Sequence, residues 1–445
     1  MSGLSAAMSS LPTFRHGVHP AEHKDATERI KLERMPFVDE YVLPLNQHIG
    51  APSKPVVAVG EKVERGQLLA EPGGFVSVGL HAPVTGVVKA IELRPHPSGR
   101  KVQTLVLTAD AYSEQRVRPM DVPNADDAPA SELIDAIQRA GLVGLGGAAF
   151  PTHVKLSVPK GKRVSFVMLN GCECEPYLTC DHRVMAEQPE DVERGLEIIM
   201  RLTGAERAYI GVERNKPDAI EALAAVVDTK RVEVVGLQVK YPQGAEKMLI
   251  DAILRREVPS GGLPLDLEIV VQNVGTAAAL AELFDHGKPL IERAVTVTGP
   301  GIRRPSNLIV PLGTPVAEVI EHCGGLLPSA KQVVLGGPMM GMAQKDLQVP
   351  VTKGTSGILV LDEAPVMFHE EPCIRCGRCV EACPMFLNPS RLAQLSRAQR
   401  PDELKDTHVL DCFECASCSF SCPSHIPLVQ LIRMGKALVR QKDGK

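Results

Sequence analysis

The alternation of apolar and polar residues changes along the chain, and each change predicts a different kind of structure. Residues 55–93 alternate short valine-rich runs with polar turns, which is typical of a compact domain of β-hairpins. Farther on, apolar strands alternate with amphipathic helices, and this order is typical of an α/β domain. The helices and strands predicted there cover residues 130–140, 164–169, 207–212, 248–256 and 267–271.

Two smaller units follow. Residues 294–350 read as strand, turn, short helix and strand, which indicates a small α+β unit. Beyond it, Leu392 and Leu395 lie three residues apart within residues 389–399, as the buried face of a helix requires. A second amphipathic helix is indicated by Leu428, Leu431, Ile432 and Leu438. The end of the chain therefore predicts a helical domain.

Length and composition indicate a water-soluble protein of several domains. At 445 residues the chain exceeds what one hydrophobic core usually supports, so about three or four domains are expected. The longest charge-free stretch, residues 72–88, contains Gly, Pro and His, and it does not predict a membrane-spanning helix. The N-terminus lacks the pattern of a secretion signal, which predicts a cytoplasmic location. A net charge of -4, with no Trp and five Tyr, argues against nucleic acid as a partner.

The cysteines give the strongest chemical signal. Twelve cysteines in a chain without a secretion signal are expected to stay reduced, so their spacing indicates metal ligation. Eight of them form two runs of the pattern C-x2-C-x2-C-x3-C-P. The first run is Cys373, Cys376, Cys379 and Cys383 before Pro384, and the second is Cys412, Cys415, Cys418 and Cys422 before Pro423.

Ligands are expected to cross between the two runs, because three thiolates of such a run bind one 4Fe-4S cluster and the fourth binds the other cluster. The first cluster is assigned to Cys373, Cys376, Cys379 and Cys422. The second is assigned to Cys412, Cys415, Cys418 and Cys383. A pair of zinc sites is the alternative, since C-x2-C is also a zinc pattern. Two matching runs that each end in proline favour iron and sulfide, and therefore the transfer of single electrons.

A glycine-rich segment and several polar residues predict a cofactor pocket in the α/β region. Three glycines lie close together after the first predicted helix, where backbone amides can approach a phosphate or a flat ring. They are Gly144, Gly146 and Gly147. Their spacing differs from the G-x-G-x-x-G fingerprint, and glycine also serves ordinary turns. Asn170 and Gln272 follow predicted strands, and ligands of open α/β sheets bind at this end of the strands. The residues alone indicate a nucleotide or cofactor pocket.

Four segments and the two cysteine runs, in this order, resemble the RnfC family of the Rnf membrane complex. The segments are GLGGAAFPT, LNGCECEP, YPQGAEK and QNVGT. The resemblance covers nearly the whole chain. A more distant similarity relates the middle of the chain to the NADH-oxidising, FMN-binding subunit of respiratory complex I. At Cys172 the complex I pattern has an acidic residue, and at Val158 it has an aromatic one.

The resemblance implies which residues bind the cofactors. It implies that FMN is held by the glycine-rich loop and by polar residues of the following segments, with NAD(H) stacked above it. The implied FMN residues are Gly144, Gly146, Gly147, Lys155, Asn170, Glu173, Gln272, Asn273 and Thr276. The implied NAD(H) residues are Phe150, Glu175 and Glu246.

The resemblance also implies a multidomain α/β fold. Residues 1–30 form an N-terminal extension, 31–112 a barrel-sandwich-like β domain, 113–290 a Rossmann-like FMN/NADH-binding domain, 291–355 an SLBB-like β-grasp domain, and 356–445 a helical ferredoxin-like domain with two 4Fe-4S clusters. The barrel-sandwich fold is similar to biotinyl and lipoyl carriers. Residues 83–86 read Pro-Val-Thr-Gly where such carriers present a modifiable Lys, so a docking role is expected. The β-grasp domain is expected to set the distance between cofactors.

The implied function is that of an NAD-dependent, ion-translocating oxidoreductase subunit. It exchanges hydride between NAD(H) and FMN and passes single electrons through two clusters towards other Rnf subunits and ferredoxin. Its implied place is the cytoplasmic face of the inner membrane, as a peripheral subunit. Two alternatives stay open. One is a soluble flavin and iron-sulfur NADH dehydrogenase module, which would lack the hairpins of residues 55–93, and the other is a flavin-free iron-sulfur relay.

Other cysteines and histidines lie outside these motifs. Three cysteines are near enough in sequence to bind a further metal, but a fourth ligand is not evident, and small buried side chains are expected. They are Cys172, Cys174 and Cys180, and a buried position is also expected for Cys323. The early histidines, His16, His19 and His23, are expected on the surface or at a partner contact.

Overall fold

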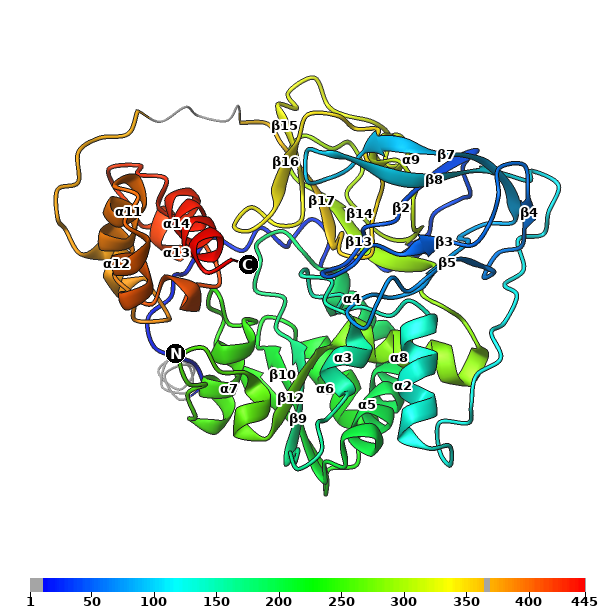
Figure 1. The fold of residues 1–445 in the computed structure, drawn as a ribbon, viewed down its shortest axis with the longest axis horizontal. Helices are drawn as coiled ribbons and strands as arrows, with labels where there is room; N and C mark the ends of the chain where they lie inside the picture. The colour runs from blue at the N-terminus through cyan, green and yellow to red at the C-terminus, as the bar shows by residue number, and fades with distance from the viewer. Residues whose placement is uncertain (1–10, 364–368, 445) are drawn as a thin grey trace.

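Four β-sheets with helices around them make up residues 11–363 and 369–444, the part of the chain that this computed structural model describes (Figure 1). The two β-rich units lie together above the α/β domain, and the helical end of the chain lies to one side (Figure 1). Within the described residues, no helix combines the length and apolar character that crossing a membrane would need.

The N-terminal β domain contains two antiparallel sheets, ordered β2-β8-β7-β4 and β3-β5-β6. Their strands are β2 (Glu40–Pro44), β3 (Lys54–Pro55), β4 (Lys62–Val63), β5 (Leu68–Glu71), β6 (Leu80–His81), β7 (Gly86–Pro95) and β8 (Lys101–Ala109). Pro83 and Val84, in the segment where a carrier would present its Lys, are buried, and Arg65 Nε donates to the Pro83 carbonyl at 3.0 Å. This segment is therefore part of the packing of the domain.

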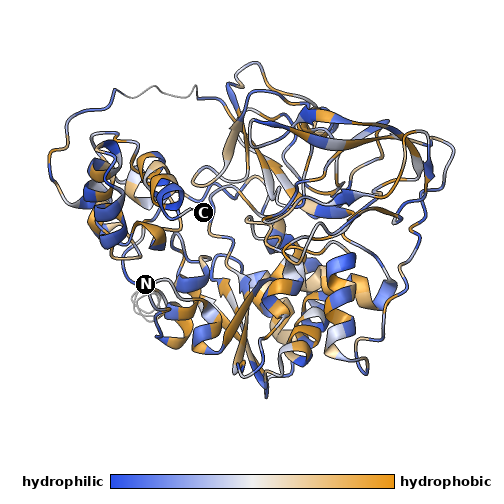
Figure 2. Ribbon diagram, in the orientation of Figure 1, coloured by the Kyte–Doolittle hydropathy of each residue, from blue (hydrophilic) through white to orange (hydrophobic). Residues whose placement is uncertain are grey.

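A parallel sheet ordered β11-β10-β9-β12 forms the centre of the α/β domain. Its strands are β9 (Phe166–Gly171), β10 (Arg207–Glu213), β11 (Val232–Leu237) and β12 (Ile269–Asn273). Its helices are α2 (Ala130–Arg139), α3 (Thr152–Leu156), α4 (Cys180–Glu187), α5 (Pro189–Thr203), α6 (Pro217–Val226), α7 (Glu246–Leu254) and α8 (Val274–His286). Along β9, Val167 and Leu169 pack in the core that contains α5 and α8, whereas Met168 packs with α7 on the other face. Burial on both faces explains the continuous apolar runs of these strands, which Figure 2 shows in orange.

The β-grasp region has a sheet ordered β1-β14-β13-β17-β15-β16. Its strands are β1 (Leu32–Arg34), β13 (Glu292–Thr298), β14 (Ser306–Pro311), β15 (Gln332–Leu335), β16 (Met342–Gln344) and β17 (Gly357–Leu361). The edge strand β1 comes from the N-terminal part of the chain and pairs in parallel with β14, with Leu32 opposite Asn307. Val316 and Ile320 of α9 (Val316–His322) pack in the core of this unit.

Short helices surround the two cysteine runs at the end of the chain. They are α10 (Arg378–Glu381), α11 (Pro389–Arg397), α12 (Pro401–Asp406), α13 (Ser417–Phe420) and α14 (Leu428–Lys442). Leu392 and Leu395 of α11 share a core with Leu428 and Ile432 of α14, with Cys379 and Cys412 packed against it. The two amphipathic helices predicted here are thus confirmed, and their apolar faces cover the cysteine-bearing loops.

Helices α5 and α8 pack closely at Gly195, where an added Cβ would lie 1.9 Å from the Ala277 carbonyl oxygen. We expect Gly195→Ala to push the helices apart and to destabilise the domain by about 1–3 kcal/mol, the usual cost of overpacking. Differential scanning calorimetry would show a lower midpoint for the α/β domain. Gly74→Ala is the matched control, because its nearest neighbour would be 4.0 Å away; an equal shift in both variants would contradict this explanation.

Candidate functional site

The carboxyl edge of the central sheet brings the polar residues of two strands together. β9 and β12 pair in parallel, with Asn170 directly opposite Asn273. The Asn273 side chain caps α8, because its Oδ1 accepts the backbone N–H of Gly275 at 2.9 Å and of Thr276 at 3.3 Å. Its Nδ2 donates to Asp181 Oδ2 at 2.6 Å. Asn170 and Asn273, two of the predicted FMN residues, are therefore neighbours. The Asn273 side chain is held through both its oxygen and its nitrogen.

The glycine-rich loop lies against this edge. An added Cβ at Gly146 would be 3.3 Å from Asn273 Nδ2, so glycine allows the loop to approach the asparagine closely. Gly147 has a φ of +124° and an exposed backbone, with no atom near its missing Cβ. The preceding Leu145 N–H donates to Thr276 Oγ1 at 2.9 Å, which ties the loop to the first turn of α8. The loop thus presents open backbone beside the ends of β9 and β12.

A second loop, which leads into α7, closes another side of the edge. Asn170 Nδ2 donates to the Gly244 carbonyl at 2.7 Å, and Asn170 Oδ1 accepts the Cys172 N–H at 3.2 Å. Lys155 forms an ion pair with Glu246 at the start of α7 and also donates to the Val271 carbonyl at 3.2 Å. The side chains of this ion pair are about one-third exposed, so they lie at the open side of the site.

The residues at this edge fit a flat, anionic cofactor such as FMN. Gln272 is buried, and its Nε2 is a donor without a hydrogen-bond partner, which is costly unless a ligand accepts from it. The glycine-rich loop adds exposed backbone that an anion can approach. Lys155 places an ammonium at the open side, where Glu246 pairs with it. Together they offer both kinds of contact that a flavin nucleotide needs.

Two predicted carboxylates contact backbone amides of the chain itself. Glu173 accepts the N–H groups of Asp181 at 2.7 Å and His182 at 3.1 Å, at the first turn of α4. Glu175 accepts those of Met340 at 2.9 Å and Met339 at 3.0 Å, in the turn between β15 and β16. Burial raises the pKa of Glu175 to about 7. Glu175 therefore joins the β-grasp unit to the α/β domain.

Two buried lysines hold the loop that carries these carboxylates, and sequence reasoning missed both. Lys24 Nζ donates to the carbonyls of Glu173 at 2.9 Å and Glu175 at 3.0 Å, and also to that of Leu178. Lys216 Nζ donates to the Cys172 carbonyl at 2.6 Å. Burial lowers the pKa of Lys24. Both lysines are remote in sequence from the loop and belong to no motif, so the sequence contained no local signal for them.

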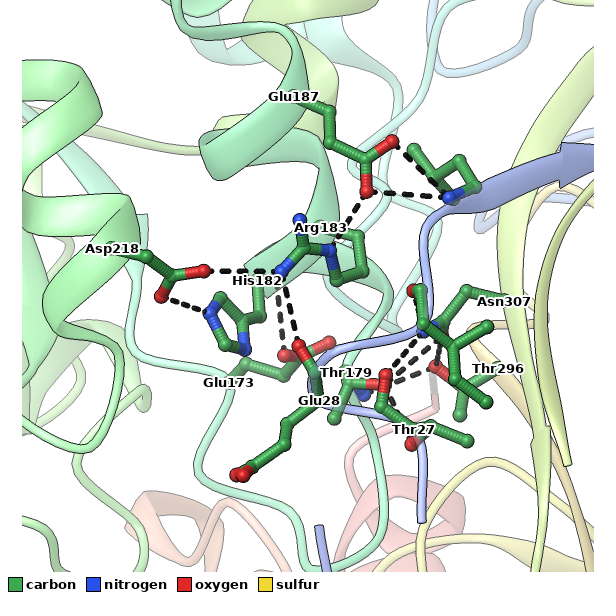
Figure 3. A network of polar contacts seen from close by, with 12 residues as sticks. Thr27, Glu28, Glu173, Thr179, His182, Arg183, Glu187, Asp218, Thr296 and Asn307 are labelled. Atoms are coloured by element: carbon green, nitrogen blue, oxygen red, sulfur yellow. Dashed lines mark hydrogen bonds and ion pairs between the residues drawn. The ribbon is translucent and has the colours of Figure 1, made fainter. Parts of the chain in front are cut away.

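Helix α4 is anchored by a polar network (Figure 3). His182 Nε2 contacts Asp218 Oδ1 at 2.6 Å, and Arg183 forms ion pairs with Asp218 at 3.1 Å and Glu187 at 2.8 Å. Thr179 Oγ1, just before the helix, lies 2.9 Å from Asn307 Oδ1 in β14. The network fixes the start of α4. It thereby also fixes the backbone N–H groups of Asp181 and His182, which donate hydrogen bonds to Glu173.

The eight cysteines of the two runs line two cavities. One cavity is lined by Cys373, Cys376, Cys379 and Cys422, and the other by Cys383, Cys412, Cys415 and Cys418. Each set combines three thiols of one run with the fourth of the other, and these are the groupings that the spacing predicts. Burial raises the pKa of several of these thiols, Cys412 to about 11, so the residues as they stand favour the neutral form until a metal binds.

The remaining cysteines lie in different surroundings. Cys172 is buried with its Sγ 3.7 Å from the Gly211 carbonyl, and Cys174 Sγ accepts the Gly244 N–H at 3.3 Å. Cys180 lies with Glu173 and Asp181, with one ligand atom of each within 4.8 Å of the others. Cys323 is buried in the core of the β-grasp unit. The first three cysteines thus point to separate neighbours.

Tyr241 connects the α/β domain to the second cysteine set. Its ring is buried, and its Oη donates to the Cys415 carbonyl at 2.8 Å. Val18 and Ala382 pack with it, and Cys174 and Cys415 border the same cluster. In contrast, Cys373 and Cys376 of the first set are exposed. The set that contains Cys415 therefore faces the α/β domain.

Known protein families match successive parts of the chain. Residues 12–112 match the RnfC barrel sandwich hybrid domain, and 137–282 match the Nuo51 FMN-binding domain. Residues 294–343 match the SLBB domain, and 372–427 match a 4Fe-4S dicluster domain. These matches confirm the predicted fold, with its β domain, flavin domain, SLBB unit and cluster domain.

Three curated relatives, all C subunits of ion-translocating complexes, extend over most of the chain. The one from the proton-translocating ferredoxin:NAD(+) oxidoreductase complex of Clostridium ljungdahlii is 46% identical over 401 residues, 90% of this chain and 88% of that protein. Its counterpart in the Na(+)-translocating ferredoxin:NAD(+) oxidoreductase complex of Acetobacterium woodii is 46% identical over 428 residues, with coverages of 95% and 96%. The relative from the ion-translocating oxidoreductase complex of Rhodobacter capsulatus is 40% identical over 445 residues, with coverages of 97% and 84%.

A flavin-binding α/β domain joined to a dicluster domain defines an NAD-dependent flavin and iron-sulfur oxidoreductase, whose cofactors are FMN, two 4Fe-4S clusters and NAD(H). The similarity to the three C subunits over nearly the full length identifies the family within this class. The chain belongs to the RnfC family of ion-translocating oxidoreductase complexes. The family resemblance inferred from the motifs is thereby confirmed.

Crossed ligation can be tested with pairs of cysteine variants. If Cys383 and Cys412 serve one cluster, Cys383→Ala combined with Cys412→Ala should leave about half of the iron and sulfide. Cys383→Ala combined with Cys373→Ala should remove nearly all of it, because each substitution damages a different cluster. Iron and acid-labile sulfide are measured in anaerobic protein, with Cys323→Ala as a control that keeps both clusters. The opposite result for the two pairs would show that each run binds its own cluster.

Proposed function

We propose that this chain is the peripheral subunit of a membrane-bound Rnf-type complex in which NAD(H) meets the electron-transfer chain. Relatives that are 46% identical over nearly the whole chain are named as components of ferredoxin:NAD(+) oxidoreductase complexes that translocate protons or Na+. The partners are then the other subunits of the complex, and ferredoxin through them. We place the chain at the cytoplasmic face of the membrane, where NAD(H) and ferredoxin are available.

In this proposal the carboxyl edge of the central sheet holds FMN. Gln272 Nε2 would donate a hydrogen bond to it, and the glycine-rich loop would contact it through backbone amides. Asn170 and Asn273 hold the surrounding loops in place through the hydrogen bonds described above. Thr276 and Lys155 complete the binding residues, with Glu173 fixing the loop behind them. FMN bound there exchanges two electrons with NAD(H) as hydride and single electrons with the clusters.

NAD(H) is proposed to bind on the open side of this site. Phe150 follows the glycine-rich loop, and its carbonyl accepts the Gly144 N–H at 2.8 Å, so its backbone is held beside the loop. Glu246 lies at the start of α7, next to Lys155. These residues, with Glu175, are the proposed contacts of the dinucleotide, and the partial exposure of Lys155 and Glu246 gives it access.

One observation carries the proposal: the edge with an unpartnered buried Gln272 amide belongs to the same domain as Tyr241, which contacts Cys415. The proposed site for hydride exchange therefore lies in the domain that contacts the second cysteine set. We propose that electrons pass first between FMN and the cluster of Cys383, Cys412, Cys415 and Cys418. The exposed set of Cys373, Cys376, Cys379 and Cys422 then exchanges electrons with the neighbouring subunits.

Replacing Asn170 or Glu246 with Ala should lower NADH:ferricyanide turnover by roughly ten- to a hundredfold, because a small misplacement of reacting groups has effects of this size. Glu233→Ala is the control, since Glu233 is exposed on β11 of the same sheet. Flavin fluorescence released on denaturation shows whether FMN is retained. Unchanged turnover in both variants would place the pocket elsewhere, and a chain that takes up no FMN would be an iron-sulfur relay.

A further inference from the structure

The N-terminal segment of residues 12–24, called the strap below, begins on the α/β domain. The Thr13 carbonyl accepts from Arg255 Nη1 at 2.6 Å, just after α7. The Phe14 carbonyl accepts from Lys240 Nζ at 3.0 Å, and the same ammonium lies 4.6 Å from the centre of the buried Phe14 ring. These contacts fix the first part of the strap beside the loop that enters α7.

The strap then crosses to the cluster domain. His16 Nδ1 lies 2.6 Å from the Glu381 carbonyl oxygen, and the Gly17 N–H donates to the Ala382 carbonyl at 3.3 Å. The His16 ring also packs edge-on against Phe386 at 4.6 Å. These contacts flank Cys383, which is one of the proposed ligands of the cluster nearer to the flavin.

Directly after this crossing the strap returns to the α/β domain. Val18 and Tyr241 exchange two backbone hydrogen bonds of 2.9 Å, as a short antiparallel bridge. Since Tyr241 Oη also reaches the Cys415 carbonyl, one residue contacts both the strap and the cluster loop. The strap, Tyr241 and the two cysteine-bearing loops therefore meet at one point.

The far end of the strap holds the flavin-side loop. The Glu22 carbonyl accepts the Tyr177 N–H at 2.8 Å, and the His23 ring stacks on the Tyr177 ring at 4.7 Å. Lys24 then binds three carbonyls of residues 173–178. A single stretch of backbone thus touches the loop beside the flavin edge and the loop that carries Cys383.

Gly17 is the residue that makes the crossing possible. Its φ is +83°, which favours glycine, and an added Cβ would lie 2.6 Å from the Tyr241 carbonyl oxygen and 2.9 Å from the Phe14 ring. A larger residue there has to move away from the Tyr241 carbonyl and the Phe14 ring, and this movement would disturb the hydrogen bond from the Gly17 N–H to Ala382. The space at Gly17 is therefore limited by Tyr241 of the α/β domain and by Phe14 of the strap, while its N–H donates to the Ala382 carbonyl of the cluster domain.

We propose that the strap is a positioning element for electron transfer, which fixes the distance between the flavin edge and the cluster that contains Cys383 and Cys415. The inference rests on the proposed function. It assigns a role in electron transfer to a segment that lies outside both cofactor domains. Another polar attachment, from Ser260 and Gly261 to Asp411, joins the same domains at η2 (Val409–Asp411). Asp411 also lies next to a proposed ligand, Cys412, but the strap differs because its far end binds the loop of residues 173–178 beside the flavin edge.

The test compares two rates in the anaerobic, cluster-loaded full chain. Stopped-flow bleaching of the clusters after mixing with NADH reports transfer across the junction, and NADH:ferricyanide turnover reports the flavin site. Gly17→Ala should slow cluster bleaching about tenfold or more, as expected for misplaced reacting groups, with ferricyanide turnover kept. His16→Ala is a milder variant that should slow bleaching selectively, by a smaller factor.

Gly99→Ala is the matched control, because Gly99 also has a positive φ, +79°, but has no neighbour within 4 Å of an added Cβ. It should change neither rate. Iron content is measured in every variant, so that lost clusters are not mistaken for slow transfer. Normal bleaching in Gly17→Ala, or an equal loss of both rates, would overturn the positioning role. Wild-type protein that fails to oxidise NADH would instead overturn the proposed function on which it rests.

Discussion

Three neighbouring parallel strands, β10, β9 and β12, end at one edge of the central sheet, and the other parts of the molecule are arranged around that edge. The register places Asn170 opposite Asn273, so the loops that follow both strands are forced to share one site. The glycine-rich loop, the turn between β15 and β16, and the strap all contact these loops. A shift in the pairing of β9 would therefore disturb the contacts of the α/β domain with both the β-grasp unit and the strap.

Much of this arrangement could be predicted from the sequence, because local patterns determine it. Apolar runs located the strands of the sheet, and cysteine spacing grouped the thiols as the two cavities do. The strand predicted at 267–271 begins later, at Ile269, because residues up to Leu267 form a 3-10 helix that ends with Glu268 at a φ of +60°. A left-handed residue of this kind leaves no periodic signal.

The junction between the domains could not be predicted, because its contacts join distant parts of the chain. Lys24, Lys216 and Lys353 are almost fully buried, and each ammonium donates to backbone carbonyls. Lys353 reaches Gly79 of the β domain at 2.8 Å and Gly141, just after α2, at 2.7 Å. An ammonium has three donors and no acceptor, so it suits a place where carbonyls of several loops converge. A lone lysine in an irregular segment gives no indication of such a partner.

The contact between His16 and Glu381 also constrains how the protein is made, since these residues are 365 positions apart. At the usual speed of bacterial translation, about 5–20 residues per second, roughly 20–70 s separate the synthesis of the two partners. During that interval the cluster domain is not yet synthesised, so of these two domains the strap can contact only the α/β domain, through Lys240, Arg255 and Tyr241. The iron-sulfur domain, which is synthesised after the other domains, then docks onto the strap and the α/β domain through His16, Gly17 and Tyr241.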